Sequence, residues 1–276
     1  MKPALVRRLA PLALLAVPLL VIPAAASSGT AATSAPLPAI ARGVDFGTSL
    51  GTDPARTLKL FPNARILRVF QNSPTTKLPY ASTHAQIWLS FENSPSQVAS
   101  GRLNAQFATA LKSWIASGRT VYWTWRHEAD RGIGINAAQY RAGWAQLLRV
   151  AARYPSSRVH SMSILTAYVL NKRHPHGNPD SWYVPAQVLG FDAYFADNLT
   201  QAMYYAKSKH KPWALPEFGA HLGDTRNVQF VRMYQQMWAS YPPIGACWYN
   251  NTSQTAFSQP LSQIPRTTAF LRSLAG

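Results

Sequence analysis

The stretch that decides the fold is TVYWTWRHE, residues 120–128. It begins as a run of β-branched and aromatic residues, which is typical of a buried strand. It ends with Arg126, His127 and Glu128 in succession. Strands of a parallel sheet are buried on both faces and rarely finish on charged residues without a use for them. We therefore expect this strand end to carry chemistry.

A second stretch, WALPEFG at residues 213–219, has the same design and places Glu217 near the end of another predicted strand. The chain has only three glutamates, and the third, Glu92, ends the predicted strand at residues 85–92. Glutamate is ordinarily a solvated helix residue, yet none of the three lies in a predicted helix. Two strand ends that each bring a Glu to a common rim predict paired-carboxylate chemistry.

From Arg42 onward, predicted strands and helices alternate along the chain. The predicted strands span residues 43–47, 64–71, 85–92, 120–128, 159–170, 186–195, 212–220 and 244–250. The predicted helices include residues 103–117, 136–152, 199–209, 228–240 and 265–274, and Asp53–Pro54 opens a shorter one. Eight strand–helix units in about 250 residues predict a single (β/α)8 TIM barrel of the α/β class. No Gly-rich dinucleotide or P-loop motif favours an open sheet.

The N-terminal region has the pattern of a targeting segment. Residues 1–26 combine a positive start, a short apolar run and a small-residue cleavage site, which predicts a secretory signal peptide. Residues 27–40 are rich in Ala, Ser, Thr and Pro and predict a flexible leader, so the barrel is expected over 41–276. We expect a secreted, extracellular monomer with no membrane anchor after cleavage.

Cysteine count and charge limit the function classes. The single Cys247 excludes an intramolecular disulfide, and we expect it to be buried as a small apolar residue. Without the predicted signal peptide the formal charge falls from +17 to +14, which predicts adhesion to anionic polymers such as those of a cell wall. The basic residues are scattered and form no nucleic-acid motif, so we expect no specific nucleic-acid binding.

Other polar and aromatic residues lie at the predicted C-terminal strand ends, where barrel enzymes have their active sites. As substrate-binding residues beside Glu128 and Glu217 we expect His127, Arg126, Tyr194, Trp248, Asp192, Glu92, Trp125 and Asp45. Aromatic side chains offer flat apolar faces to sugar rings. We expect Trp114, Trp123 and Trp144 to be core residues. We expect no cofactor and no metal, since His174 and His176 have no carboxylate or Cys at ligand spacing.

The chain resembles a retaining barrel glycoside hydrolase, and most closely glycoside hydrolase family 26, the β-mannanase family. Four features carry the resemblance over about residues 42–274. His127–Glu128 ends the fourth strand, and Glu217–Phe218–Gly219 ends the seventh. Tyr194 lies near the end of the sixth strand, and Trp248 lies on the eighth.

The resemblance implies a role for each of these residues. Glu128 would be the acid/base, Glu217 the nucleophile and Tyr194 the hydrogen-bonding partner of the nucleophile. Trp248 would be a stacking platform, and His127 would hold Glu128 or a sugar hydroxyl. The implied substrate is a β-linked polysaccharide, β-mannan or a related β-glucan. The sequence departs from the family at residues 129–130, where Ala-Asp replaces a Met-Asn-type continuation.

Two alternatives remain open at this stage. Glu128 and Glu217 could be structural, each paired with Arg126, Arg68 or Arg131. The whole chain could also be a non-catalytic carbohydrate- or wall-binding barrel held to acidic polymers by its charge. The enzymatic hypothesis expects the two carboxyl groups roughly 5–5.5 Å apart. It also expects Trp248→Ala to weaken catalysis without unfolding the protein.

Overall fold

The computed structural model describes residues 44–50, 53–78, 84–171, 175, 178–194, 199–250 and 258–275. The predicted signal peptide at 1–26 and leader at 27–40 lie outside the described residues, as do His174 and His176. Within the described ranges, none of the helices is both long enough and apolar enough to cross a membrane.

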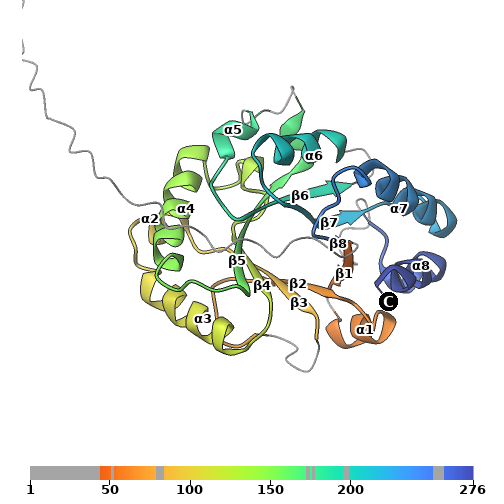
Figure 1. Cartoon of the computed structure of the whole chain (residues 1–276), viewed down its shortest axis with the longest axis horizontal. Helices are drawn as coiled ribbons and strands as arrows, with labels where there is room; N and C mark the ends of the chain where they lie inside the picture. Colours follow the sequence, from red (N-terminus) through yellow and green to blue (C-terminus); the bar gives the residue numbers. More distant parts are fainter. Residues whose placement is uncertain are drawn as a thin grey trace, which may run out of the picture. The chain divides into compact units, whose positions relative to one another are not determined.

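Eight parallel strands close into a barrel in which each strand pairs with its neighbours in sequence order and β8 returns to β1 (Figure 1). The strands are β1 (Asp45–Ser49), β2 (Ile66–Gln71), β3 (Gln86–Phe91), β4 (Val121–Trp125), β5 (Val159–Thr166), β6 (Val188–Tyr194), β7 (Trp213–Gly219) and β8 (Gly245–Trp248). This closed order confirms the predicted (β/α)8 TIM barrel.

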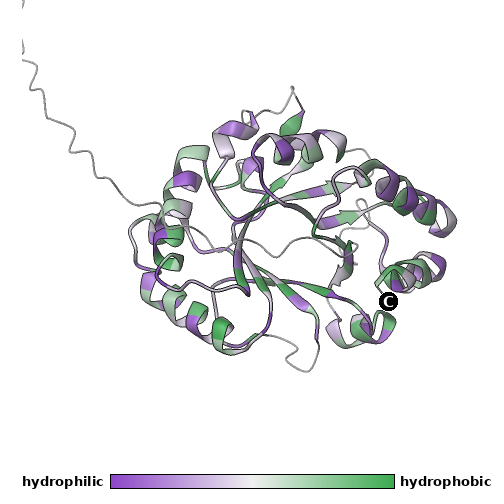
Figure 2. Ribbon diagram, viewed as in Figure 1, coloured by the Kyte–Doolittle hydropathy of each residue, from purple (hydrophilic) through white to green (hydrophobic). Residues whose placement is uncertain are grey.

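Helices surround the strands in a ring (Figure 1). They are α1 (Pro54–Leu60), α2 (Pro95–Ala99), α3 (Asn104–Ala116), α4 (Ala137–Ala151), α5 (Pro179–Trp182), α6 (Leu199–Ser208), α7 (Asp224–Trp238) and α8 (Pro265–Ala275). The caps follow from the sequence: the Asp53 carboxylate accepts the Arg56 N–H, and Asn136 forms a capping box with Gln139. Figure 2 shows that the surrounding helices carry both hydrophilic and hydrophobic residues, as amphipathic helices do.

The core has two layers because successive side chains of a strand point to opposite faces. The inner layer fills the barrel and consists of Ile66, Trp88, Tyr122, Met162, Ile164, Val188, Ala214 and Cys247. Cys247 is fully buried there, which confirms the expectation for this residue. The outer layer lies between the strands and the helices and is larger. Every second residue of a strand points into the barrel, and only those residues can reach the barrel mouth.

Tryptophans dominate the outer layer between β4 and α4. Trp123 stacks on Trp144 with ring centroids 5.2 Å apart, and both are buried, as is Trp114. These three predicted core residues are confirmed. Trp125 lies in the same layer, fully buried, and a Cβ on Gly143 of α4 would come within 2.3 Å of its ring. The expectation that Trp125 binds substrate is wrong, because its ring packs against α4 rather than facing the mouth.

Candidate active site

Glu217 occupies an irregular part of β7. Pro216 precedes it and has no N–H to offer a neighbouring strand. The pairing of β7 with β8 shifts register between Leu215 and Phe218, on either side of this Pro–Glu pair. Such irregularities re-aim side chains. The Phe218 ring packs outward against Phe230, whereas Glu217 is only 4% exposed and belongs to the polar group at the barrel mouth.

Glu128 follows β4 in a strained backbone. Arg126 and Glu128 both have left-handed conformations, with φ of 48° and 53°. Such a conformation costs a non-glycine residue of order 1 kcal/mol or more and persists only where the surroundings hold it. Here the Glu128 N–H donates to the Ile164 carbonyl of β5 at 3.0 Å. The strain turns the chain sharply at the end of β4 and places the Glu128 side chain at the mouth.

Asp130 anchors the 3₁₀ turn Ala129–Arg131 that follows Glu128. Its buried carboxylate accepts the backbone N–H of Thr166 at 3.0 Å and also accepts the Thr166 hydroxyl. Burial raises the pKa of the Asp130 carboxyl to about 6, although both hydrogen bonds oppose that rise. The Asp–Thr contact ties the turn to the end of β5 and so restricts the backbone of Glu128.

Three carboxyl groups converge at the mouth. Each of Glu128, Glu217 and Asp192 places one carboxylate oxygen within 4.8 Å of the others. Asp192 and Tyr194 lie two residues apart on β6 and therefore share a face. The Tyr194 hydroxyl donates to Oε2 of Glu217 at 2.7 Å, the contact that the resemblance implies. The structure thus brings together four of the predicted site residues.

Each of the two glutamates also has an arginine beside it. The Nη1 atom of Arg131 donates to Oε2 of Glu128 at 2.9 Å, and the Arg131 side chain is 54% exposed. Arg68 is fully buried, with Nη2 3.7 Å from Oε1 of Glu217. Among the described residues, neither Nε nor Nη2 of Arg68 has a hydrogen-bond acceptor. Both glutamates therefore have the arginine neighbours that a purely structural role, as ion-pair partners, would require.

Burial and mutual repulsion control the charges of these carboxyl groups. Burial raises the pKa of Glu217 to about 7; the Arg68 guanidinium lowers it, the nearby Glu128 raises it and the Tyr194 hydrogen bond lowers it. Burial also raises the pKa of Asp192 well above its usual value, and the charges of Glu217 and Glu128 add to the effect. Neither Asp192 oxygen has a hydrogen-bond donor within the described part of the chain. The site therefore favours the protonated form of Asp192 more than water does.

We expect Glu217→Gln to raise the free energy of unfolding by roughly 3 kcal/mol at pH 8 and to change it little at pH 4. The pKa of Glu217 is about 7 in the fold and 4.5 in its ordinary state, so the folded protein keeps a proton that the unfolded chain releases between these values. That release lowers the stability of the wild type as pH rises through this window. Urea unfolding of both proteins at several pH values measures the difference; a difference independent of pH would contradict the expectation.

His127 and Glu92 lie beside a hollow at the rim. The hollow has a volume of about 230 Å³ and is lined by Phe70, Gln71, Asn72, Ser90, Glu92 and His127. Nδ1 of His127 lies 3.8 Å from Oε1 of the exposed Glu92 side chain. Burial, followed by the charges of neighbouring arginines, lowers the pKa of His127 to about 3, so the imidazole is neutral. A neutral imidazole and an exposed carboxylate at a rim hollow can both hydrogen-bond sugar hydroxyls.

Asp45, one of the predicted site residues, lies elsewhere. Asp45 begins β1, opposite Gly245 at the start of β8, and accepts a hydrogen bond from Gln86 at the start of β3. It therefore lies at the N-terminal end of the barrel, and its assignment to the rim is wrong. The reason is that β1 runs to Ser49, two residues beyond the predicted end. The Arg126 guanidinium donates to the Ile133 carbonyl, so it holds the following loop.

Trp248 is the third correction. Its side chain is fully buried in the outer layer, where its ring meets Phe218 edge-on at 5.5 Å and its N–H donates to the Gln259 carbonyl. It cannot act as a stacking platform at the mouth. The next residue, Tyr249, has the opposite parity, and its ring lies 5.9 Å from that of Tyr194. The aromatic residue that β8 brings to the site is therefore Tyr249.

Because Trp248 is buried, we now expect its replacement by alanine to destabilise the fold rather than only to weaken catalysis. Trp248→Ala should cost about 3–5 kcal/mol of folding stability, because it removes a large buried side chain and leaves a cavity. Thermal unfolding followed by circular dichroism measures the loss. A variant with the melting temperature of the wild type would contradict the burial of Trp248 and support a position at the exposed rim.

Three residues that the structure places at or near the site are not among the substrate-binding residues expected from the sequence. Arg68 contacts Glu217, Phe70 is 43% exposed beside the His127 ring, and Tyr249 contacts Tyr194. Arg68 and Phe70 lie two residues apart on β2 and so share a face. The Arg68 guanidinium lies 4.4 Å from the Phe70 ring centre. An arginine in the middle of a buried strand was the available signal, since such a charge is rarely buried without a partner.

The group of Glu128, Asp192 and Glu217 has the geometry to hold a metal ion. Carboxylate oxygens suit hard cations such as Mg²⁺ or Ca²⁺. The guanidinium of Arg68 opposes this use, because it already places a fixed positive charge beside Glu217. The raised pKa of Asp192 further weakens the group as a metal ligand set, because a ligand carboxyl group must be ionised.

The fold is similar to those of solved glycoside hydrolases. A mannanase from Bacillus subtilis matches with a TM-score of 0.55 at 12% identity, covering 82% of this chain and 85% of that one. A family 26 β-mannanase from Bacteroides ovatus matches at 0.51 and 15% identity, covering 85% and 90%. The family 26 domain of a Prevotella bryantii endo-β-mannanase/endo-β-glucanase matches at 0.54 and 12% identity, covering 85% and 89%. No family model and no curated protein sequence matches the chain. At these identities the similarity establishes that the chain shares the barrel fold of these enzymes.

Proposed function

We propose that this protein is a retaining glycoside hydrolase that cleaves a β-linked polysaccharide, with Glu128 as acid/base and Glu217 as nucleophile. The observation that carries the proposal is the convergence of these carboxyl groups from the ends of β4 and β7. Their nearest oxygens lie within 4.8 Å, and Tyr194 holds one oxygen of Glu217. Retaining enzymes have carboxyl groups about 5–5.5 Å apart, whereas inverting enzymes leave about 6.5–9.5 Å for a water molecule.

The chemistry proceeds in two displacements. In the first, a carboxylate oxygen of Glu217 attacks the anomeric carbon while Glu128 gives its proton to the departing glycosidic oxygen. The products are a glycosyl ester on Glu217, an ionised Glu128 and the released leaving group. In the second, Glu128 takes a proton from water as the water oxygen attacks the anomeric carbon. The ester breaks, Glu217 leaves as a carboxylate, and Glu128 is protonated again.

The surroundings of Glu217 suit it to the role of nucleophile. The attacking group must be ionised, and both the Arg68 guanidinium and the Tyr194 hydrogen bond favour the ionised form. Burial raises the pKa of Asp192 well above its usual value, which disfavours a second negative charge beside Glu217. Tyr194 and Arg68 also fix the carboxylate in position, which lowers the entropy cost of attack.

The arginine pairs do not favour a purely structural role for the glutamates. Arg131 is half exposed, and a pair of that kind typically contributes 0.2–1 kcal/mol. Such a contact can open to release Glu128 when a substrate arrives. Arg68 makes no hydrogen bond to Glu217 at 3.7 Å, and replacing a buried ion pair by apolar residues is often neutral for stability. A stabilising role would not need a third, unpartnered carboxyl group at Asp192.

The substrate class follows from the site and from the similarity of fold. The solved structures with this fold include mannanases, which supports β-mannan or a related β-glucan as the polymer. Phe70 and Tyr249 are the aromatic residues placed to contact sugar rings. The Ala129–Asp130 departure changes the loop beside the acid/base, so we extend the proposal to other β-linked glycans.

Export belongs to the same proposal. Residues 1–26 have the composition of a secretory signal peptide, and a polysaccharide substrate lies outside the cell. N-terminal sequencing of protein recovered from culture medium should find a start at or near Ser27. Recovery of the chain only from cells, with Met1 or Lys2 at its start, would contradict export.

The pH dependence of kcat/KM should show an acid limb with an apparent midpoint near 7. The cause is ionisation of Glu217, whose pKa burial raises to about 7, so activity increases as this carboxyl loses its proton. Initial rates at low substrate concentration between pH 4 and 9 provide the profile. An acid limb with a midpoint below 5 would contradict this description of the site.

A polysaccharide panel tests the proposal directly. Purified protein is incubated with β-mannan, mixed-linkage glucan, xylan and a bacterial envelope glycan, and reducing ends and product anomers are followed, the latter by NMR. We expect release from at least one polymer with the β-anomer formed first. Glu128→Gln and Glu217→Ala should abolish release, whereas the matched change Glu92→Gln, at the exposed third glutamate, should cost less than about tenfold.

The alternative outcome is equally specific. A wild-type protein that releases nothing but is retained on the polymer would support the non-catalytic binding barrel. Initial formation of the α-anomer would contradict the retaining mechanism while leaving hydrolysis in place. Circular dichroism of each variant confirms that the fold is intact before activities are compared.

A further inference from the structure

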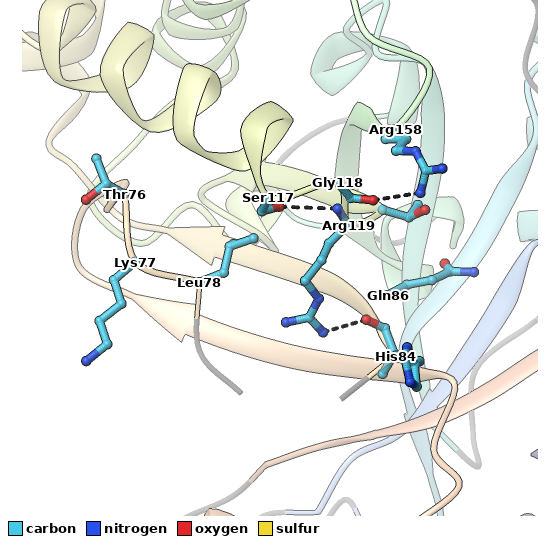
Figure 3. Close-up of a pocket in the computed structure, with 11 residues that line it drawn as sticks. Thr76, Lys77, Leu78, His84, Gln86, Ser117, Gly118, Arg119 and Arg158 are labelled. Carbon is cyan, nitrogen blue, oxygen red and sulfur yellow. Dashed lines mark hydrogen bonds between the residues drawn. The ribbon is translucent and has the colours of Figure 1, made fainter. Parts of the chain in front are cut away.

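A second concave site lies away from the three carboxyl groups, near the N-terminal ends of the strands. It is a hollow of about 680 Å³ lined by Thr76, Lys77, Leu78, His84, Ala85, Gln86, Ser117, Gly118, Arg119, Thr120 and Arg158 (Figure 3). Gln86 is the first residue of β3, Thr120 immediately precedes β4, and Arg158 immediately precedes β5. The active site uses the opposite ends of the strands. We call this hollow the basic groove.

The charges of the basic groove all have one sign. Lys77, Arg119 and Arg158 contribute three positive charges, and none of the described lining residues is acidic. Among the described residues, neither Lys77 nor Arg158 forms an ion pair with a carboxylate. Like charges that share a concave surface repel each other and raise the local potential for anions. An anionic ligand would relieve that repulsion.

The two arginines are held in place by the backbone. Arg119 donates from Nη2 to the Ala85 carbonyl, and Arg158 donates from Nη1 to the Gly118 carbonyl, both at 2.6 Å. Figure 3 shows the Arg119 side chain between Lys77 on one side and Arg158 on the other. Burial lowers the pKa of the half-buried Arg119, an effect that a bound anion would reverse. The two arginine charges are therefore held in place along the groove, and Lys77 adds a third charge at its exposed edge.

We propose that the basic groove binds a linear acidic glycan, a polysaccharide that carries carboxylate groups along its length. Charges spread along the groove suit repeated negative groups better than one small anion. Threonine and serine hydroxyls and the Gln86 amide lie among the cations and can bond sugar hydroxyls. Apart from His84, none of the described lining residues is aromatic, so these residues offer few of the stacking faces on which single-stranded nucleic acids rely.

The proposal is independent of the catalytic one. The groove and the carboxyl group cluster lie at opposite ends of the strands, so a glycan in the groove leaves the cleft open. The net charge of the whole chain predicts adhesion to anionic polymers, and the basic groove is a specific surface at which that adhesion would occur. The two proposals can fail separately, because binding to an acidic polymer and hydrolysis of a neutral polymer are measured in different assays.

The test compares two charge-matched double variants of the full-length mature protein. Lys77→Gln with Arg158→Gln removes two charges from the groove. Lys207→Gln with Arg226→Gln removes one lysine and one arginine from exposed positions on α6 and α7. Binding to polygalacturonate is measured by isothermal titration at 50 and 200 mM salt. Double-stranded DNA and inorganic polyphosphate serve as comparison polyanions.

We expect the groove variant to bind polygalacturonate at least about tenfold more weakly, since each contact of Lys or Arg with an anionic surface strengthens binding roughly fivefold. The control variant should stay within about twofold of the wild type, and added salt should weaken binding of the wild type most. Both double variants should melt and hydrolyse a neutral substrate like the wild type. Equal weakening in both variants would show that diffuse charge alone is responsible and would overturn the proposal. Absence of wild-type binding, or tighter groove-dependent binding of DNA or polyphosphate, would also overturn it.

Discussion

Glu217→Ala is expected to lower kcat on the best polysaccharide by roughly 10⁴-fold or more, the scale seen when an enzyme loses its nucleophile. The substitution removes a carboxyl group that both Tyr194 and Arg68 contact. It should leave the fold intact, because it removes a carboxyl group whose burial is unfavourable. Rates on the polymer panel, with enzyme concentration raised to compensate, measure the loss.

Azide makes the test more specific. In Glu217→Ala a small anion can occupy the space of the missing carboxylate and attack the anomeric carbon, which should restore activity and yield an α-glycosyl azide. In Glu128→Ala the azide should instead attack the glycosyl ester on Glu217 and yield a β-glycosyl azide. Identical products from the two variants would contradict the separate roles. Asp192→Asn serves as a comparison, since it replaces the third carboxyl group with an amide of similar shape that cannot ionise.

Arg68→Met is expected to move the acid limb of the kcat/KM profile upward by at least about one pH unit and to reduce activity at pH 6.5 by about 100-fold. Arg68 is the buried cation beside Glu217, and its removal favours the protonated, non-nucleophilic form of that carboxyl. Methionine has a similar length and no charge, and buried ion pairs can often be replaced by apolar residues without loss of stability. The protein should therefore fold while its activity moves to higher pH.

Arg131→Met is the matched control. It removes the same kind of group from Glu128, but the Arg131 side chain is half exposed, so its loss should change activity less than about tenfold. If Arg68→Met lowered kcat equally at every pH, Arg68 would act by holding the structure rather than by setting the charge of Glu217. Equal effects of the two substitutions would contradict the difference in burial on which the argument rests.

The fold was predictable because its determinants are local. The aromatic run of β4, the Asp53 and Asn136 caps and the periodic apolar positions of α4 each specify an element without distant contacts. Eight such units in series leave a closed barrel as the consistent arrangement. Strand ends were less predictable, since β1 begins and ends two residues later than predicted. Its end depends on pairing with β2 and β8, which a local pattern does not report.

Site residues with unusual chemistry could be predicted from the sequence. Residues whose place depends on which face of a strand they occupy could not. Glu128 and Glu217 stood out because a carboxylate at a strand end has no ordinary structural explanation. Trp248 was misplaced because a shift of one residue reverses the face of a strand, and the residue that contacts Tyr194 is Tyr249. Arg68 was expected only as one of three possible ion-pair partners, because its contact with Glu217 joins β2 to β7, far apart in the sequence.

Covalent trapping tests the central claim most directly. A 2-deoxy-2-fluoro glycoside of the preferred sugar, with a good leaving group, slows hydrolysis of the glycosyl ester and lets it accumulate. Mass spectrometry of the intact protein, followed by peptide mapping, should find one fluorosugar per chain attached to Glu217. Attachment to Glu128 or Asp192, or turnover of the parent substrate through the inverted anomer with no adduct, would contradict the account.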